Sequence, residues 1–118
     1  MLSFHAHLKV FVATAPADLR MSFNGLWNAA QQQLGEDPKS GAIFVFGNRR
    51  HNRIKILYFD GTGVCVLAKR LESGTFAWPQ GAGEPGAKIK LAPQALQLLL
   101  DGVELKSAAR RAWYEAAA

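Results

Sequence analysis

The order of apolar and polar positions predicts a strand followed by a long helix at the start of the chain. Residues 8–14 (LKVFVAT) are rich in β-branched and aromatic side chains, which favour a strand, and Pro16 ends it. Over residues 19–34, apolar side chains recur at steps of three and four, which predicts a helix with one buried stripe. We expect the Asp18 carboxylate to cap this helix by accepting hydrogen bonds from the free N–H groups of its first turn.

Three more strands are expected in quick succession after the polar loop at residues 36–41 (EDPKSG). They cover residues 42–46, 53–59 and 64–71, where β-branched and aromatic side chains are again frequent. The sequence DGTG at residues 60–63 joins the last two strands as a tight turn, because glycine tolerates positive φ angles.

The elements of the C-terminal third are shorter. Strands are expected at residues 75–78 and 88–91, and a helix over residues 93–101 begins with proline in its first turn and stops at Gly102. The Ala-rich tail from residue 106 is expected to form a frayed helix. Together these elements predict an α+β fold, an antiparallel meander of about four to five strands with an N-terminal and a C-terminal helix packed on one face.

Length and composition indicate one folded domain. A chain of 118 residues can bury a core without disulfides, and an apolar content of 49% is too high for a disordered chain. We assign residues 8–105 to a single domain, with a flexible N-terminus at residues 1–7 and a basic, Ala-rich tail at residues 106–118.

Positive charge is concentrated in the segment at residues 47–71, where Asp60 is the only carboxylate. Because like charges repel one another, such a concentration on regular structure indicates an anionic partner, and nucleic acid is the commonest one. Six of the 14 lysines and arginines lie in this segment, and they are our candidate nucleic-acid-binding residues: Arg49, Arg50, Arg53, Lys55, Lys69 and Arg70.

Strand alternation predicts how these cations are arranged. With residues 61–62 as the loop of a hairpin, Arg53 lies opposite Arg70, and both share one face with Lys55. Like charges directly opposite each other destabilise a sheet, so this pair favours a phosphate bound between them. The Arg-Arg-His loop at residues 49–51 extends the basic patch at one end of the sheet. The alternative is a solvated face that keeps a sheet edge from aggregating, but that role predicts mixed signs.

The whole chain has a formal net charge of +5 and a pI near 9.7, which favours polyanions, an acidic protein or a membrane surface. One cysteine, Cys65, excludes an internal disulfide and a thiolate metal cluster, so a reducing cytoplasm is the expected compartment. No stretch is long enough to span a membrane.

The residues offer no catalytic set, and we expect neither enzymatic activity nor a cofactor or metal. His51 could act as a general base in a small basic nuclease, but the available acids have no diagnostic spacing. His5 and His7 lack a third metal ligand. Cys65 is expected to be a buried structural thiol, and Trp78 a core or interface residue.

Several spaced motifs resemble the TnpB accessory proteins of the IS66 family of bacterial insertion sequences, which are distinct from the RNA-guided nuclease of the same name. The resemblance covers roughly residues 8–105 and is carried by the segments VFVATAPADLRMSFNGL, DPKSGAIFVFGNRRHNRIKILYFDGTG, AKRLESGTFAWP and IKLAPQALQLLLDGVEL. One departure is Met21, where a basic residue is common in the family.

The resemblance implies a role in transposition beside a separate, larger transposase that carries the cutting chemistry. It implies no catalytic residues, and it favours the ends of the insertion sequence as the DNA partner. No helix-turn-helix is predicted, so DNA contact would come through strands, loops or the tail. Two alternatives remain open: an interaction subunit or homo-oligomer that uses the apolar strands and Trp78 as its surface, and the small nuclease.

Overall fold

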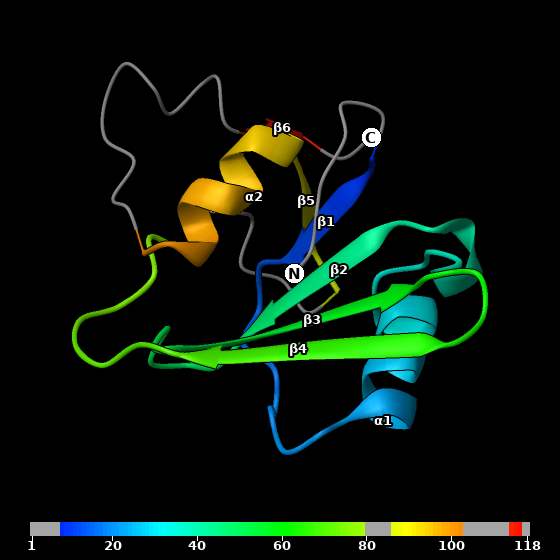
Figure 1. The fold of residues 1–118 in the computed structure, drawn as a ribbon, viewed down its shortest axis with the longest axis horizontal. Coiled ribbons are helices and arrows are strands. Elements are labelled where there is room, and N and C mark those ends of the chain that lie inside the picture. The colour runs from blue at the N-terminus through cyan, green and yellow to red at the C-terminus, as the bar shows by residue number, and fades with distance from the viewer. Residues whose placement is uncertain (1–7, 80–85, 103–113, 117–118) are drawn as a thin grey trace.

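The computed structural model describes residues 8–79 and 86–102, together with the backbone of residues 114–116. Its strands form one sheet in the order β4-β3-β2-β1-β5-β6, and helices pack against it (Figure 1), which confirms the predicted α+β class. The strands are β1 Val10–Ala13, β2 Ile43–Gly47, β3 Arg53–Phe59, β4 Val64–Arg70, β5 Lys88–Leu91 and β6 Tyr114–Ala116. The helical segments are α1 Phe23–Asn28, the π-helix η1 Ala29–Gln33, the 3-10 helix η2 Pro38–Ser40 and α2 Pro93–Leu100.

The meander predicted from the sequence is confirmed for β2, β3 and β4, which pair antiparallel in succession. β1 instead lies parallel to β2, with Val10 opposite Ile43, and β5 pairs antiparallel with its other side. A parallel pair needs a crossover connection, and here α1 and η1 lie within that connection.

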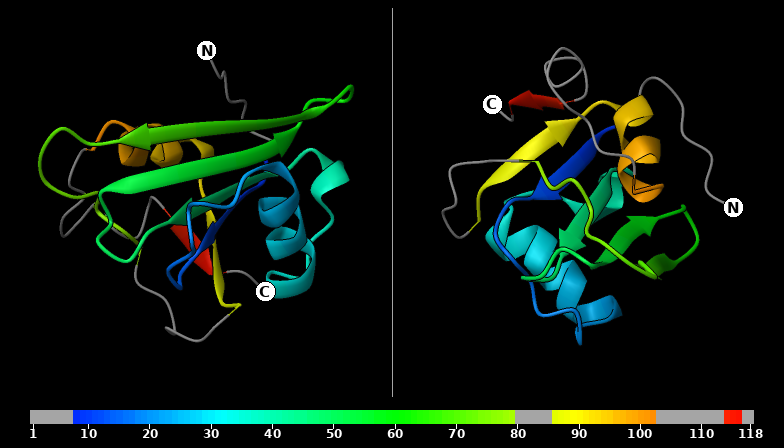
Figure 2. Two further views of the ribbon diagram at one scale, coloured as in Figure 1. Left: turned by 90° about the horizontal axis from the view of Figure 1, so that it is seen from below. Right: turned by 90° about the vertical axis from the view of Figure 1, so that its left-hand side faces the viewer.

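The two helical layers cover opposite faces of the sheet (Figure 2), so the expectation that both helices share one face is wrong. α1 and η1 cover the face that carries Phe11, Phe44 and Leu57. α2 covers the face that carries the alternate side chains, among them Val10 and Val45. The central strands are therefore buried on both faces, which explains why VFVA and IFVFG are continuous apolar runs.

The first helix begins at Phe23, four residues later than the sequence predicts, and Asp18 does not cap it. The Asp18 carboxylate instead accepts hydrogen bonds from the Arg20 backbone N–H at 3.0 Å and from the Arg20 guanidinium at 2.7 Å. This pairing lowers the pKa of Asp18 to about 2. The local turn uses the acceptor that a helix N-terminus at residue 19 would need.

The segment expected as a strand at residues 75–78 forms no strand, because its backbone and the Trp78 side chain bond to other parts of the fold. The Phe76 N–H donates to the His51 carbonyl at 2.7 Å, and the Trp78 indole N–H donates to the Ala13 carbonyl at 3.2 Å. Both rings are buried in the core under α2.

The C-terminal tail also differs from its prediction. Residues 114–116 form β6 beside β5 rather than part of a frayed helix. The expected flexible N-terminus at residues 1–7, and the tail at residues 106–113 and 117–118, lie outside the described residues. In the part of the chain that is described, no helix is long and apolar enough to cross a membrane.

Gly47 provides the space for the Trp78 ring. A Cβ added at Gly47 would lie 2.6 Å from the ring, far inside van der Waals contact. We expect Gly47→Ala to lower the free energy of unfolding by about 1–3 kcal/mol through overpacking, as measured by urea denaturation. Gly63→Ala is the matched control, since a Cβ there meets no atom within 4 Å. Equal stability of the two variants would contradict this role of Gly47.

Candidate nucleic-acid interface

The β3–β4 hairpin has the register that the sequence predicts. Arg53 lies opposite Arg70, Lys55 opposite Ala68 and Phe59 opposite Val64. The turn is held by the Asp60 carboxylate, which accepts hydrogen bonds from the backbone N–H groups of Thr62 and Gly63, both at 2.9 Å. These bonds lower the pKa of Asp60, so the hairpin's one carboxylate is already engaged in the turn, away from the basic end.

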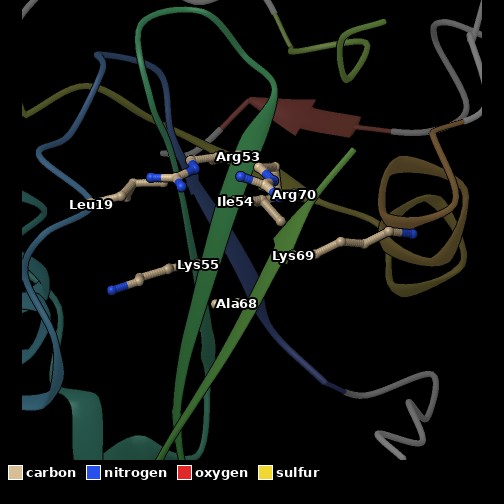
Figure 3. A pocket seen from close by; sticks show the side chains of 7 residues that line it. All are labelled: Leu19, Arg53, Ile54, Lys55, Ala68, Lys69 and Arg70. Atoms are coloured by element: carbon tan, nitrogen blue, oxygen red, sulfur yellow. The ribbon is translucent and has the colours of Figure 1, made fainter. Parts of the chain in front are cut away.

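A hollow of about 340 Å³ lies over the basic end of this hairpin (Figure 3). Arg53 and Arg70 are exposed there, and within the described residues neither guanidinium makes a hydrogen bond or an ion pair. No carboxylate is among the residues that line it, which are Leu19, Arg53, Ile54, Lys55, Ala68, Lys69 and Arg70.

The two lysines of the hairpin bond to backbone carbonyls. The Lys55 ammonium donates to the Met21 carbonyl at 2.8 Å and so ties β3 to the segment before α1. Lys69 points the opposite way, toward α2 (Figure 3), and donates to the Leu100 carbonyl at 2.5 Å. A cation at a helix C-terminus is favourable because the last carbonyls lack intrahelical partners.

The structure therefore brings together Arg53, Lys55 and Arg70 of the six predicted residues on one face. Lys69 belongs to the other face, as strand alternation requires of a residue next to Arg70.

Arg49 and Arg50 lie exposed in the β2–β3 loop, which a pair of asparagines closes. The Asn48 side-chain oxygen accepts hydrogen bonds from the N–H groups of Asn52 and Arg53, both at 3.1 Å, and its amide nitrogen donates to the Asn52 side chain at 2.7 Å. This closure was not predicted from the sequence. The four-residue spacing of the two asparagines around RRH is the signal that could have indicated it.

His51 adopts a left-handed backbone conformation with φ of 57°, which is uncommon for a residue other than glycine. Its ring stacks on Trp78 with centroids 5.3 Å apart and planes 14° apart. Burial lowers the pKa of His51 below its ordinary value of 6.5. In the described part of the chain no carboxylate hydrogen-bonds to His51, so the geometry lacks the partner that a general base needs.

Among the described residues, Cys65 and Tyr58 do not form a reactive site. Cys65 lies opposite Tyr58, and it is half-buried, so the expectation of a buried thiol is wrong; its Sγ lies 3.6 Å from an Asp60 carboxylate oxygen. Burial also raises the pKa of Tyr58. Among the residues that the structure describes, no group of three or more His, Cys, Asp or Glu side chains could hold a metal ion.

Comparison with known proteins identifies the family. Residues 8–110 match the family described as IS66 Orf2 like protein, and the chain belongs to this family of insertion-sequence proteins. It is 36% identical over 104 residues to the uncharacterized protein y4hO of Sinorhizobium fredii, covering 88% of each chain. It is also 38% identical over 97 residues to the uncharacterized protein y4jC of the same organism, covering 82% of this chain and 80% of that protein. No solved structure matches the chain.

The lowered pKa of His51 makes stability depend on pH in a defined direction. The unfolded chain binds a proton at His51 near pH 6.5, whereas the folded protein binds it only at lower pH. His51 therefore contributes fully to stability above that pH, and the contribution is lost as the pH falls through the window below it. Urea unfolding of the wild type and His51→Asn, compared between about pH 5 and pH 7.5, isolates the effect. Identical pH dependence in the two proteins would contradict it.

Proposed function

We propose that this protein is a non-catalytic accessory factor for DNA transposition of a bacterial insertion sequence, acting in the cytoplasm beside a separate transposase. We further propose that it binds DNA phosphates through the hollow at the basic end of the β3–β4 hairpin. The observation that carries the proposal is the cross-strand pair of Arg53 and Arg70, two exposed guanidinium groups without a partner in the described structure.

The pair is unfavourable unless an anion joins it. Like charges directly opposite each other on a sheet repel, and no carboxylate lines the hollow to offset them. A phosphate between the two guanidinium groups would accept charge-assisted hydrogen bonds from both. Lys55 adds positive charge at the same face, although its own bond to the Met21 carbonyl fixes its position.

Membership of the insertion-sequence family supports DNA among the possible anions. The phosphates at the ends of the element are the partner that this role requires. The proposal includes no chemical step, because the residues that line the hollow contribute cations and aliphatic groups but neither a nucleophile paired with a base nor a carboxylate.

The proposal predicts the salt dependence of DNA binding. Log affinity falls linearly with log salt, and each lost phosphate contact makes this slope less steep by about 0.9. Arg53→Gln/Arg70→Gln together should therefore make it less steep by about 2. Fluorescence anisotropy with duplexes from the element ends, titrated at several salt concentrations, measures the slope. Arg20→Gln removes a charge that is paired with Asp18 and is the matched control.

Wild-type protein that fails to bind these duplexes at low salt would overturn the proposal. So would a slope that falls as much in Arg20→Gln as in either single variant at Arg53 or Arg70.

A second candidate function is an interaction subunit that pairs with the transposase, and the edge strand β4 favours it. Within the residues that the structure describes, β4 has a neighbouring strand on one side only, and Leu67 in its middle is 42% exposed. An exposed strand edge can accept a strand from a partner protein. Trp78, a candidate for such a surface from the sequence, is 8% exposed and belongs to the core.

The edge-strand function predicts that Leu67→Asp weakens co-purification with the transposase in the presence of nuclease, while the affinity for DNA falls less than threefold, within about 0.6 kcal/mol. The reverse result, a nuclease-sensitive complex that Leu67→Asp does not affect, would leave DNA as the link between the two proteins.

A further inference from the structure

The β2–β3 loop, residues 48–52, is more rigidly constructed than a phosphate contact requires. The Asn48 side chain bridges to Asn52 and Arg53, and the His51 N–H donates to the Asn48 carbonyl at 3.1 Å. The His51 carbonyl accepts a bond from Phe76, and the Asn52 carbonyl accepts one from Leu71 at 2.9 Å. The loop is thus fixed to the segment that follows β4 as well as to β3.

This construction holds His51 in a conformation that costs free energy. A left-handed φ of 57° is unfavourable for histidine, and the stack on Trp78 and the bonds around it maintain the conformation. The result is a tight turn with Arg49 and Arg50 exposed at its tip. Screened attraction between a cation and a phosphate is weakly directional, and flexible side chains satisfy it without a fixed backbone. Contact within a DNA groove, by contrast, needs donors in fixed positions.

We infer that the β2–β3 loop inserts Arg49 and Arg50 into the minor groove of DNA, with His51 as the positioning residue that fixes the turn. The inference rests on the proposed function, since it places the loop on DNA that the hollow at Arg53 and Arg70 holds by its phosphates. It assigns the loop a different task, the recognition of groove shape.

The dimensions favour the minor groove. The major groove is about 12 Å wide and accommodates a helix or a two-stranded ribbon, whereas the minor groove is about 6 Å wide and accepts single side chains. A two-residue turn tip with adjacent arginines fits the narrower groove. Guanidinium groups are favoured there because a narrow minor groove has an enhanced negative potential, and because guanidinium is more weakly hydrated than ammonium.

The loop and the hollow are close enough to engage one DNA segment. Three peptide units separate Arg50 from Arg53, so their Cα atoms lie within about 11 Å of each other. The bond from the Leu71 N–H to the Asn52 carbonyl holds the loop beside the residue that follows Arg70. Both sets of arginines therefore lie at the same end of the hairpin.

The test compares the binding of A/T-rich and G/C-rich duplexes of equal length by fluorescence anisotropy. The wild type should prefer the A/T-rich duplex roughly fivefold or more, and netropsin, which occupies the A/T minor groove, should compete with it. Arg49→Lys/Arg50→Lys keeps both charges, so it should lose the preference while retaining the salt slope.

His51 is tested by a matched pair of substitutions. Asparagine tolerates the left-handed conformation, and a β-branched residue does not. His51→Asn should therefore retain most of the preference, and His51→Val should lose it while its salt-dependent binding persists. If His51→Val does not fold, as judged by circular dichroism, Arg49→Lys/Arg50→Lys tests the inference on its own, because both substitutions lie at exposed positions.

A preference that survives Arg49→Lys/Arg50→Lys, or binding of the A/T-rich duplex that netropsin leaves unchanged, overturns the inference. Salt-dependent binding without any preference overturns the inference and leaves the proposed function standing. Failure of the wild type to bind either duplex overturns both.

Discussion

The packing of Trp78 fixes the end of the sheet where the arginines gather. Its ring fits over Gly47 at the end of β2, its indole N–H donates to the Ala13 carbonyl at the end of β1, and the His51 ring stacks on it. One side chain thus joins two central strands to the β2–β3 loop. Because the surrounding contacts are dense and partly strained, a substitution at any of these positions should shift the packing at the others.

Three lysines of the described structure and the arginines of the basic end have different roles. Lys55, Lys69 and Lys88 donate to backbone carbonyls at Met21, Leu100 and Leu34, next to or within the helical segments. Lys88 also pairs with Glu36 and lies 5.5 Å from the centroid of the Phe11 ring. These lysines hold the helices to the sheet. The arginines of the basic end have no such partners in the described structure, so the charge available to a ligand is mainly guanidinium.

Sequence reasoning predicted the elements whose signals are local. The DGTG turn fixed the register that places Arg53 opposite Arg70, and the bounds of β3 and β5 agree with the strands predicted at residues 53–59 and 88–91. It failed where a tertiary contact or a competing local bond decided the outcome. The Asp18–Arg20 pair moved the helix start, and the anchoring of Trp78 prevented a strand.

The candidate site was predicted in part for the same reason. Strand alternation identified the face shared by Arg53, Lys55 and Arg70, but counting charge along the chain included Lys69, which lies on the other face. The left-handed conformation of His51 depends on bonds to Phe76 and on stacking with Trp78, residues distant in the sequence. No local pattern could reveal those partners. The opposite placement of the two helices was readable from apolar runs that do not alternate.

The cross-strand arginine pair also has an evolutionary consequence. Under the proposed function, a pair that costs the free protein stability persists only while selection acts on binding, whereas the packing of Gly47 and Trp78 serves folding itself. In copies of the element that have lost mobility but still produce folded protein, Arg53 and Arg70 should accumulate substitutions before the core does. The rate of substitution at Arg53 and Arg70 would then differ between mobile and immobile copies, and sequencing of intact and interrupted copies within one genome would show the difference.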